Sequence, residues 1–368
     1  IMLAAWNNTK VEVMQYLCDT FKDTIDINKQ NKNGETALIL AAQYDTNQNV
    51  LQYLCTTFKD TININQQNKH GNTIFMLAAQ NNTNVKVMQD LCTTFKDTID
   101  INKQNKNRYT VLMLAAWKCT NVAVIQCLCN TFKDKIDINK QCNIVSNCKT
   151  STHEHTTDIN KQNNDNYTAL MFAVQYNTNE KILQCLCNTT FKDTIDINKQ
   201  DNEGNTALIL TLWKARKEKC MQYLCDIFKD TIDINKKNIY GYTALMYAAQ
   251  TVQNKNVGIV QYLCDTFKDT IDINQQNNHG NTVFMLAAWN NTNVEVIQYL
   301  YNTFKDTIDI NKQNNNGKTA LVLASQNKNN EVKQHLYSIL ETKPDASQQH
   351  IQKHNHNRQK KISTQKKY

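Results

Sequence analysis

The stretch Asn31-Lys-Asn-Gly34-Glu-Thr36-Ala37-Leu-Ile-Leu-Ala-Ala42 contains the two signals that decide the fold. Its first half has the composition of a tight turn, in which Gly34 suits a backbone with positive φ. Thr36 follows at the position where a side-chain oxygen can cap the first turn of a helix. The apolar run 37–42 then predicts a short helix that is buried over most of its surface.

A second helix and an extended segment complete the unit. Polar residues 43–48 interrupt the apolar run. An amphipathic helix is then indicated by the i, i+3, i+4, i+8 spacing of Val50, Tyr53, Leu54 and Phe58. Residues 61–65 alternate between polar and apolar side chains and lead out of the unit as an extended arm. Such a unit cannot bury its apolar face alone, so it must stack on its neighbours.

The unit is repeated along most of the chain. Its marker is the tripeptide Phe-Lys-Asp, which recurs at Phe21, Phe58, Phe95, Phe132, Phe191, Phe228, Phe267 and Phe304. Most gaps are 37 residues, but the gap of 59 residues after Phe132 contains a second Asp-Ile-Asn and predicts an insertion of about 21 residues. We therefore expect nine units over residues 1–341, the first truncated, with the insertion at about 142–157 and a basic disordered tail at 342–368.

The repeat resembles the ankyrin repeat in the pattern Gly34-x-Thr36-Ala37-Leu38-x-x-Ala41-Ala42, with Val50, Leu54 and Asp/Asn-Ile-Asn downstream. The resemblance covers residues 1 to about 340 and implies an all-α, ankyrin-type helix-turn-helix solenoid with hairpin or loop arms. Ala or Val replaces the Pro of the family, and Ile, Met or Val replaces its His. Because the unit is longer than the family's, we expect about one more turn on the second helix. Arg108 and Asn166 replace the turn glycine in two copies, and Arg should cost about 1 kcal/mol there.

Composition excludes several classes of protein. The 368 residues include only 7 Gly and 1 Pro, which is too few for many strand-rich turns. No apolar run approaches the ~18 residues that a membrane span needs, so we expect no membrane association. The 13 Cys are an odd number, and seven of them recur at one position of the repeat, which argues against a disulfide framework. A reducing compartment is expected, the cytoplasm with the nucleus as alternative. The chain opens at Ile1 in the middle of a repeat, which predicts a fragment of a longer protein.

The positive charge is concentrated in the tail. Of the formal net charge of +8, +5 comes from residues 341–368, which contain seven Lys and Arg against only Glu341 and Asp345. A solvating tail is the favoured interpretation, with nuclear localisation or weak RNA contact as the alternative. The array shows no basic stripe in the sequence, which makes nucleic acid an unlikely main ligand.

The cysteines and other chemical motifs have structural interpretations. The row Cys18, Cys55, Cys92, Cys129, Cys187, Cys225 and Cys264 predicts buried core thiols. The insertion carries Cys142, Cys148, His153 and His155, whose side chains are zinc ligands by chemistry, but their spacing fits no compact zinc motif. A polar loop is favoured there, and zinc stays open. No arrangement of nucleophile, base and acid is evident, so we expect neither an enzyme nor a cofactor.

The binding surface should lie where first helices and arms form a groove. The position after Ala-Ala holds Trp6, Gln43, Gln80, Trp117, Gln175, Trp213, Gln250, Trp289 and Gln326. Aromatic residues along a groove are typical interface anchors. The predicted partner-binding residues are Trp117, Trp213, Trp289, Tyr109, Tyr167, Tyr176, Tyr242, Lys118 and Lys214. The alternative is that the tryptophans pack between repeats. The binding groove would then be formed by polar and charged positions of the repeat, such as Lys118, Lys214 and Glu203.

These observations predict a monomeric, non-enzymatic scaffold that binds a partner protein along the concave face of the solenoid. The alternative is a targeting or regulatory array belonging to a larger enzyme or ubiquitin-ligase adaptor that is truncated before residue 1. The identity of the partner does not follow from the sequence.

Overall fold

The computed structural model confirms the all-α fold. It describes residues 1–7, 10–43, 48–80, 85–119, 121–132, 160–177, 179–187, 191–213, 217–250, 256–289, 294–326 and 330–342. Within these ranges there are 18 α-helices and no strand. The predicted insertion at 142–157 and the tail from 343 onward lie outside the described residues.

The contacts divide the chain into two compact units, Ile1–Asp233 and Ile234–Tyr368, and each is built from helix pairs. In the first unit the first helices of the pairs are α1 (Met2–Trp6), α3 (Ala37–Gln43), α5 (Ile74–Gln80), α7 (Val111–Lys118), α9 (Ala169–Tyr176) and α11 (Ala207–Trp213). Their second helices are α2 (Val11–Thr20), α4 (Gln48–Thr57), α6 (Val85–Phe95), α8 (Val122–Phe132), α10 (Glu180–Leu186) and α12 (Glu218–Phe228). Short 3₁₀ turns η1 (Lys22–Thr24) and η4 (Lys192–Thr194) follow two of them.

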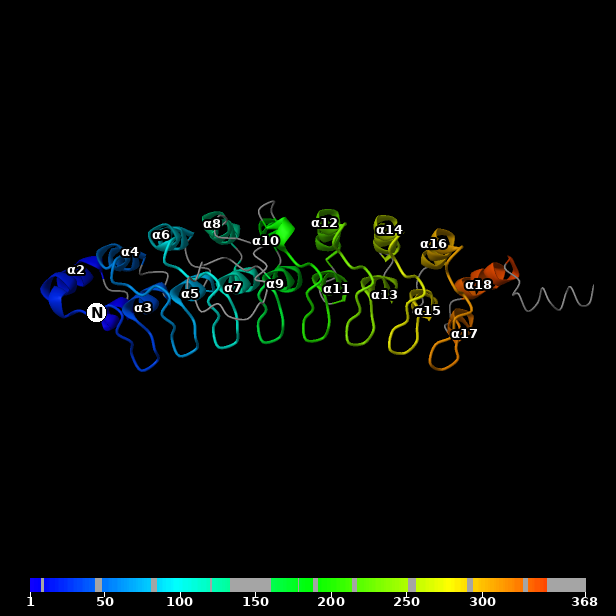
Figure 1. Ribbon diagram of the computed structural model, residues 1–368, viewed down its shortest axis with the longest axis horizontal. Coiled ribbons are helices and arrows are strands. Elements are labelled where there is room, and N and C mark those ends of the chain that lie inside the picture. Colours follow the sequence, from blue (N-terminus) through cyan, green and yellow to red (C-terminus); the bar gives the residue numbers. More distant parts are fainter. Residues whose placement is uncertain are drawn as a thin grey trace, which may run out of the picture. The chain divides into compact units, whose positions relative to one another are not determined.

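The second unit has the same construction. Its first helices are α13 (Ala244–Gln250), α15 (Val283–Trp289) and α17 (Ala320–Gln326), and its second helices are α14 (Asn256–Phe267), α16 (Val294–Phe304) and α18 (Asn330–Thr342). Within each unit the first helices form one row and the second helices another, with the looped arms extending beyond the first row (Figure 1). Several second helices run through the Phe of Phe-Lys-Asp, as the longer repeat predicts.

The first helices are short because their role is burial. In α3 every residue of 37–42 is buried, and the alanines allow the neighbouring first helices to approach closely. Thr36 caps this helix, since its hydroxyl oxygen accepts a hydrogen bond from the Ile39 amide at 3.2 Å. The turn before it has the expected conformation, with Gly34 at φ 73°. Arg108 and Asn166 adopt φ 61° and 60° at the same position, so the strained backbone is present in both copies without glycine.

The row of repeating cysteines lies in the core, as predicted from the sequence. All seven repeating cysteines are buried and carry free thiols. Burial raises the pKa of Cys55, Cys225 and Cys264 to about 12, as expected for apolar core positions. The Phe of Phe-Lys-Asp is buried from Phe95 onward, Phe58 is half-buried, and Phe21 at the start of the chain is 52% exposed.

Asparagine side chains join consecutive arms, a role that the sequence analysis missed. Asn65 donates from Nδ2 to the Thr98 carbonyl at 2.7 Å, and its Oδ1 accepts from the Asp100 amide at 2.8 Å. The same pair of bonds is made by Asn28, Asn160, Asn198, Asn235 and Asn274 to the arm that follows each of them. The Asn of Asp-Ile-Asn therefore fixes the register between repeats rather than merely ending an extended segment.

Glutamine side chains make a second set of links nearer the turns. Gln104 donates from Nε2 to the Arg108 carbonyl in its own turn at 2.7 Å and to the Gln162 carbonyl of the next arm at 3.0 Å. Gln30, Gln67, Gln162 and Gln276 each make the equivalent bond to the following arm. The abundance of Asn and Gln in this chain thus satisfies backbone groups that loops would otherwise leave to water.

The insertion does not separate its flanking repeats. Helix α7 packs directly on α9, and α8 on α10. Asn177 donates from Nδ2 to the carbonyls of Ala116 and Cys119, at 2.9 Å each. The insertion follows α8, and the arm beginning at residue 160 returns to the regular register, so the flanking repeats stack as the others do.

Candidate aromatic and acidic binding site

Five aromatic rings from two stacked repeats form the most distinctive cluster of the first unit. Trp117, at the end of α7, stacks on Tyr109 with ring centroids 5.6 Å apart and on Phe172 of α9 at 5.5 Å. The Trp117 plane differs by 23° from that of Tyr109 and by 24° from that of Phe172, so Trp117 stacks on both rings, whereas Tyr109 and Phe172 are tilted by 47° to each other. Tyr167 and Tyr176 contact Phe172 at 5.1 Å and 5.8 Å. The resulting aromatic cluster consists of Tyr109, Trp117, Tyr167, Phe172 and Tyr176.

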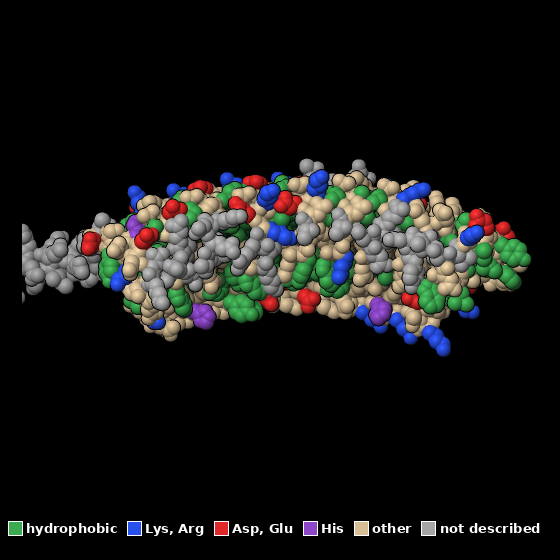
Figure 2. Space-filling model, turned by 180° about the vertical axis from the view of Figure 1, so that it is seen from behind, with side chains coloured by type: hydrophobic (Ala, Val, Ile, Leu, Met, Phe, Trp, Pro, Cys, Tyr) green, Lys and Arg blue, Asp and Glu red, His purple; other side chains and the backbone are tan. Residues whose placement is uncertain are grey.

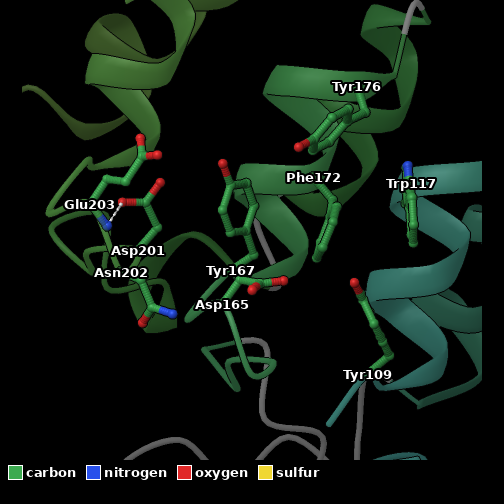
Figure 3. Close-up of a pocket in the computed structure, with 9 residues that line it drawn as sticks. All are labelled: Tyr109, Trp117, Asp165, Tyr167, Phe172, Tyr176, Asp201, Asn202 and Glu203. Carbon is green, nitrogen blue, oxygen red and sulfur yellow. Dashed lines mark hydrogen bonds between the residues drawn. The ribbon is translucent and has the colours of Figure 1, made fainter. Parts of the chain in front are cut away.

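The cluster borders a cavity of about 290 Å³. Its other lining residues are polar or acidic and come from the tips of the next two arms: Asp165, Asp201, Asn202 and Glu203. In Figure 3 the side chains of Asp201 and Glu203 lie on one side of Tyr167, and the remaining rings lie on its other side. The cavity therefore combines an aromatic wall with three carboxyl groups, and no lysine or arginine is among its lining residues.

The arms hold these groups by local hydrogen bonds. Asp201 is buried, and its Oδ1 accepts from the Glu203 amide at 2.9 Å and the Asn205 amide at 2.8 Å. In the previous arm, Asn163 accepts in the same way from the amides of Asp165 and Tyr167, at 3.0 Å and 2.7 Å. Asp201 thus performs the turn-stabilising role of an asparagine while adding a carboxylate to the cavity.

Two tyrosines show the electrostatic character of the cavity. Burial, together with the nearby Asp201 carboxylate, raises the pKa of Tyr167. Burial also raises the pKa of Tyr109, with a smaller contribution from Asp165. The Tyr167 hydroxyl donates to Oε1 of Gln175 at 2.6 Å, which holds the ring in place. Both phenols stay neutral at physiological pH and present ring faces beside negative charge.

Lys118 contacts the outer part of the cluster. Its Nζ lies 4.1 Å from the centroid of the Trp117 ring, which is cation–π geometry. The side chain is exposed and does not line the cavity. Lys214, which the sequence placed in the equivalent slot, lies outside the described residues.

A second cavity lies on the corresponding face of the second unit. It has a volume of about 350 Å³ and is lined by Tyr242, Gln250, His279, Asn281, Leu286, Trp289, Asn314 and Asn316. Tyr242 also packs against Tyr247, with centroids 5.0 Å apart. This cavity shares the slots of the first one but has no carboxyl group among its lining residues.

The tryptophans differ in exposure. Trp6 and Trp289 are both 49% exposed, whereas Trp117 and Trp213 are half-buried. Trp213 packs against the core of the first unit and lines neither of the two cavities. Trp117 both packs between repeats and lines a cavity. The two interpretations of the tryptophan row, a groove residue or a residue packed between repeats, are therefore compatible for Trp117.

The sequence analysis named four of the five clustered rings but missed part of the site. Phe172 occupies a first-helix slot in which Leu40, Leu77, Leu114, Leu210, Leu286 and Leu323 stand in other copies. Glu203 was predicted only in the alternative in which polar residues form the groove, and Asp165 and Asp201 were not predicted. A slot-by-slot comparison would have found them, because Asn fills the Asp201 slot in the other copies as Asn31, Asn68, Asn105, Asn163, Asn238, Asn277 and Asn314.

The arm tips also carry a short basic row that the sequence analysis overlooked. Lys32, Lys69 and Lys106 are exposed in the same slot of three consecutive arms. Backbone bonds link these tips, from the Lys69 amide to the Asn33 carbonyl at 2.9 Å and from the Lys106 amide to the His70 carbonyl at 3.1 Å. Figure 2 shows basic side chains gathered at this edge, whereas acidic and basic side chains alternate along the opposite edge.

Metal and membrane sites were sought in the part of the chain that the structure describes. No group of three or more His, Cys, Asp or Glu there could hold a metal ion. Cys142, Cys148, His153 and His155 lie outside it, so the zinc question stays open. None of the described helices is long and apolar enough to cross a membrane.

The fold and its repeats agree with the comparison to known families. A family model of ankyrin repeats, three copies long, matches residues 1–105, 143–238, 195–277, 215–314 and 265–348. The chain therefore belongs to the ankyrin-repeat family. Ankyrin repeats are in general modules for protein–protein interaction and are typically not enzymes. No curated protein matches the chain.

Proposed function

We propose that this chain is a protein-interaction scaffold that binds a partner along the face formed by its first helices and arms, without catalysis of its own. The observation that supports this most directly is the cavity of about 290 Å³ bordered by the aromatic cluster. Large aromatic side chains at a preformed hollow are the usual anchors of an interface. The chain is proposed to act as a monomer.

The rigidity of the arms favours binding. Ordering loops on association reduces affinity, and each immobilised flexible side chain costs about 0.5–1.5 kcal/mol. Here the arms that carry Tyr109, Tyr167 and Glu203 are already held by the Asn and Gln links between repeats. The free thiols of the buried Cys row fit a reducing compartment, so we propose the cytoplasm as the site of action.

A site-specific photocrosslinker tests this function. Tyr176 is 48% exposed at the cavity, and Tyr16 is 69% exposed on a second helix, so both can be replaced by a photoreactive phenylalanine derivative in the full chain. We expect the derivative at Tyr176 to crosslink to a defined protein that then binds the purified chain, and the derivative at Tyr16 not to do so. Tyr176→Ala should weaken that binding about thirtyfold, the loss of roughly 2 kcal/mol typical of an anchor. Equal crosslinking from both positions, or unchanged binding by Tyr176→Ala, would contradict the proposal.

A further inference from the structure

We propose that the cavity beside the aromatic cluster binds the side chain of an arginine from a basic segment of the partner. This inference rests on the proposed function and names the chemistry of the partner at that site. It starts from the coincidence of two kinds of side chain, aromatic rings and carboxylates, around one hollow of the first unit.

The size of the cavity limits the occupant. Pockets for whole small-molecule ligands usually span about 300–1,000 Å³. At about 290 Å³, this cavity is at the lower limit of that range and suits one large side chain better than a folded element or a cofactor. An extended partner segment lying over the arms could insert such a side chain while its backbone stays outside.

The charge of the lining selects a cation. Asp165, Asp201 and Glu203 contribute carboxyl groups, and no basic residue lines the cavity to balance them. An anionic group would be repelled, which disfavours nucleic-acid phosphates. Asn205 donates from Nδ2 to Asp201 and Glu203, and Asn163 donates from Nδ2 to Asp165, so these carboxylates have neutral hydrogen-bond donors. An apolar side chain would remove water from their negative charges and supply no positive charge in return, which is costly. A cation is the occupant that offsets this cost.

The concentration of acidic residues is confined to two arms. The tip slot of the successive arms reads Asn33, His70, Asn107, Asp165, Glu203, Tyr240, His279 and Asn316. The Asp201 slot holds Asn in all the other copies that have it. The carboxyl groups in these two slots therefore occur only in the arms that border the cavity. Repeats that are otherwise nearly identical have diverged here in three positions of like charge.

The rings favour arginine over lysine. The rings of Tyr109, Trp117, Tyr167 and Tyr176 border the cavity, and the planar guanidinium group of arginine stacks on aromatic faces. It can also donate two parallel hydrogen bonds to a carboxylate, which an ammonium group cannot do in that geometry. Lys118 already shows that this cluster attracts a cation, since its Nζ lies over Trp117.

Matched peptides test the proposal on the full chain. The probes are fluorescent Gly-Ser peptides with one central residue, either arginine, its neutral isostere citrulline, lysine or trimethyllysine. We expect the arginine peptide to bind at least tenfold more tightly than each of the others, with an advantage over citrulline that falls as salt rises. Equal binding of arginine and citrulline up to roughly 1 mM, where binding free energy is only about −4 kcal/mol, would overturn the cation site. Equal or tighter binding of lysine or trimethyllysine would overturn the assignment to arginine.

Variants taken from the chain's own repeats keep the fold intact. Asp201→Asn with Glu203→Asn introduces residues that other arms already use at both positions and should remove the preference for arginine. Because Asn205 donates to both of these carboxylates, the melting temperature of the variant is measured alongside to show that it stays folded at the assay temperature. Glu35→Asn removes a carboxyl group that does not line the cavity and should leave the preference unchanged. Lys118→Gln removes a like charge beside Trp117 and should raise the affinity for the arginine peptide.

The same double variant separates this inference from the proposed function. If Tyr176 crosslinks to a partner that binds the double variant and the parent chain equally, the chain is an interaction module but the arginine site is wrong. If the partner's binding falls tenfold or more in the double variant and not in Glu35→Asn, the arginine site is supported. If no partner crosslinks but the arginine preference holds, the proposed function fails and the cation site stands.

Discussion

The substitution Trp117→Gln tests how much the aromatic cluster stabilises the packing of two repeats. Several other repeats carry glutamine at this position. From sequence alone, an exposed tryptophan in this slot should be replaceable with little effect on folding. The structure predicts otherwise, because Trp117 is half-buried and stacks on rings from its own repeat and the next. The prediction is that Trp117→Gln loosens the packing of α7 on α9.

The magnitude follows from the contacts. Trp117 makes two stacked pairs and one tilted pair, the last with Tyr176 at 6.1 Å. Each aromatic pair contributes about 0.5–1.5 kcal/mol beyond burial. A half-buried ring also loses roughly 100 Å² of apolar contact, or about 2.5 kcal/mol at 25 cal/mol per Å². Neighbouring rings can close part of the gap, so we expect a net loss of about 3 kcal/mol.

Amide hydrogen exchange on the full chain measures this loss locally. Because stacked repeats open in parts, the relevant signal is exchange in α7 and α9 rather than a single melting temperature. A loss of about 3 kcal/mol corresponds to exchange roughly a hundredfold faster in these helices. Trp289→Gln is the control, since Trp289 is 49% exposed, and it should change exchange in α15 less than tenfold. Equal effects of the two substitutions would refute the claim that stacking stabilises the repeats around α7 and α9.

Three further predictions concern the arms and the thiols. Asn65→Ala removes both side-chain hydrogen bonds to the next arm and should lower the free energy of unfolding in urea by about 1–2 kcal/mol. Asn107→Ala is the control and should have little effect, because among the described residues the Asn107 side chain makes no such pair of bonds. Arg108→Gly relieves a positive φ of 61° and should raise the free energy of unfolding by about 1 kcal/mol, so a lower value in urea unfolding would contradict the strain. A hydrogen bond from the Cys92 thiol lowers the pKa of Cys127, which is half-buried, whereas burial raises the pKa of the repeating core thiols. Among these cysteines, iodoacetamide should therefore label Cys127 first, and its labelling should need a higher pH in Cys92→Ala.

The repeat architecture could be derived from sequence because each local signal was confirmed by its neighbours. Gly34 predicted a turn, Thr36 a cap and 37–42 a buried helix, and each has that structure. Their recurrence at a fixed period made the assignment far safer than one copy would have been. The connections between arms could not be derived in the same way. Asn65 reaches a residue 33 positions away, and polarity alone does not say whether a side chain faces water or the backbone of the next repeat.

The candidate site was only partly predictable for a related reason. All four tryptophans stand at one position of the repeat, so they are conspicuous in the sequence. The residues that surround Trp117 in space come from other positions of the repeat and are not conspicuous. Trp213 belongs to the same sequence row but lines neither of the two cavities, whereas Phe172 and Asp201 come from rows that otherwise look structural. Residues from three different slots converge because successive arms and first helices lie side by side. The periodicity of the sequence shows which positions of the repeat correspond to one another. Only the stacked structure shows that the unusual residues at several of these positions lie close together.

The proposed site is built from departures from the repeat. A position filled by Asn in seven arms and by Asp in one is satisfied structurally by either residue, because both accept the same two backbone amides through Oδ1. Oδ2 of Asp201 also accepts a hydrogen bond from Nδ2 of Asn205 at 3.2 Å, and the carboxylate lies close enough to Tyr167 to contribute to its raised pKa. In the proposed arginine site, this carboxylate beside the aromatic rings is the group that would receive the cation. In the preceding arms the tips are basic at Lys32, Lys69 and Lys106, so a partner segment that inserts an arginine into the cavity would also be favoured by acidic residues directed toward those arms.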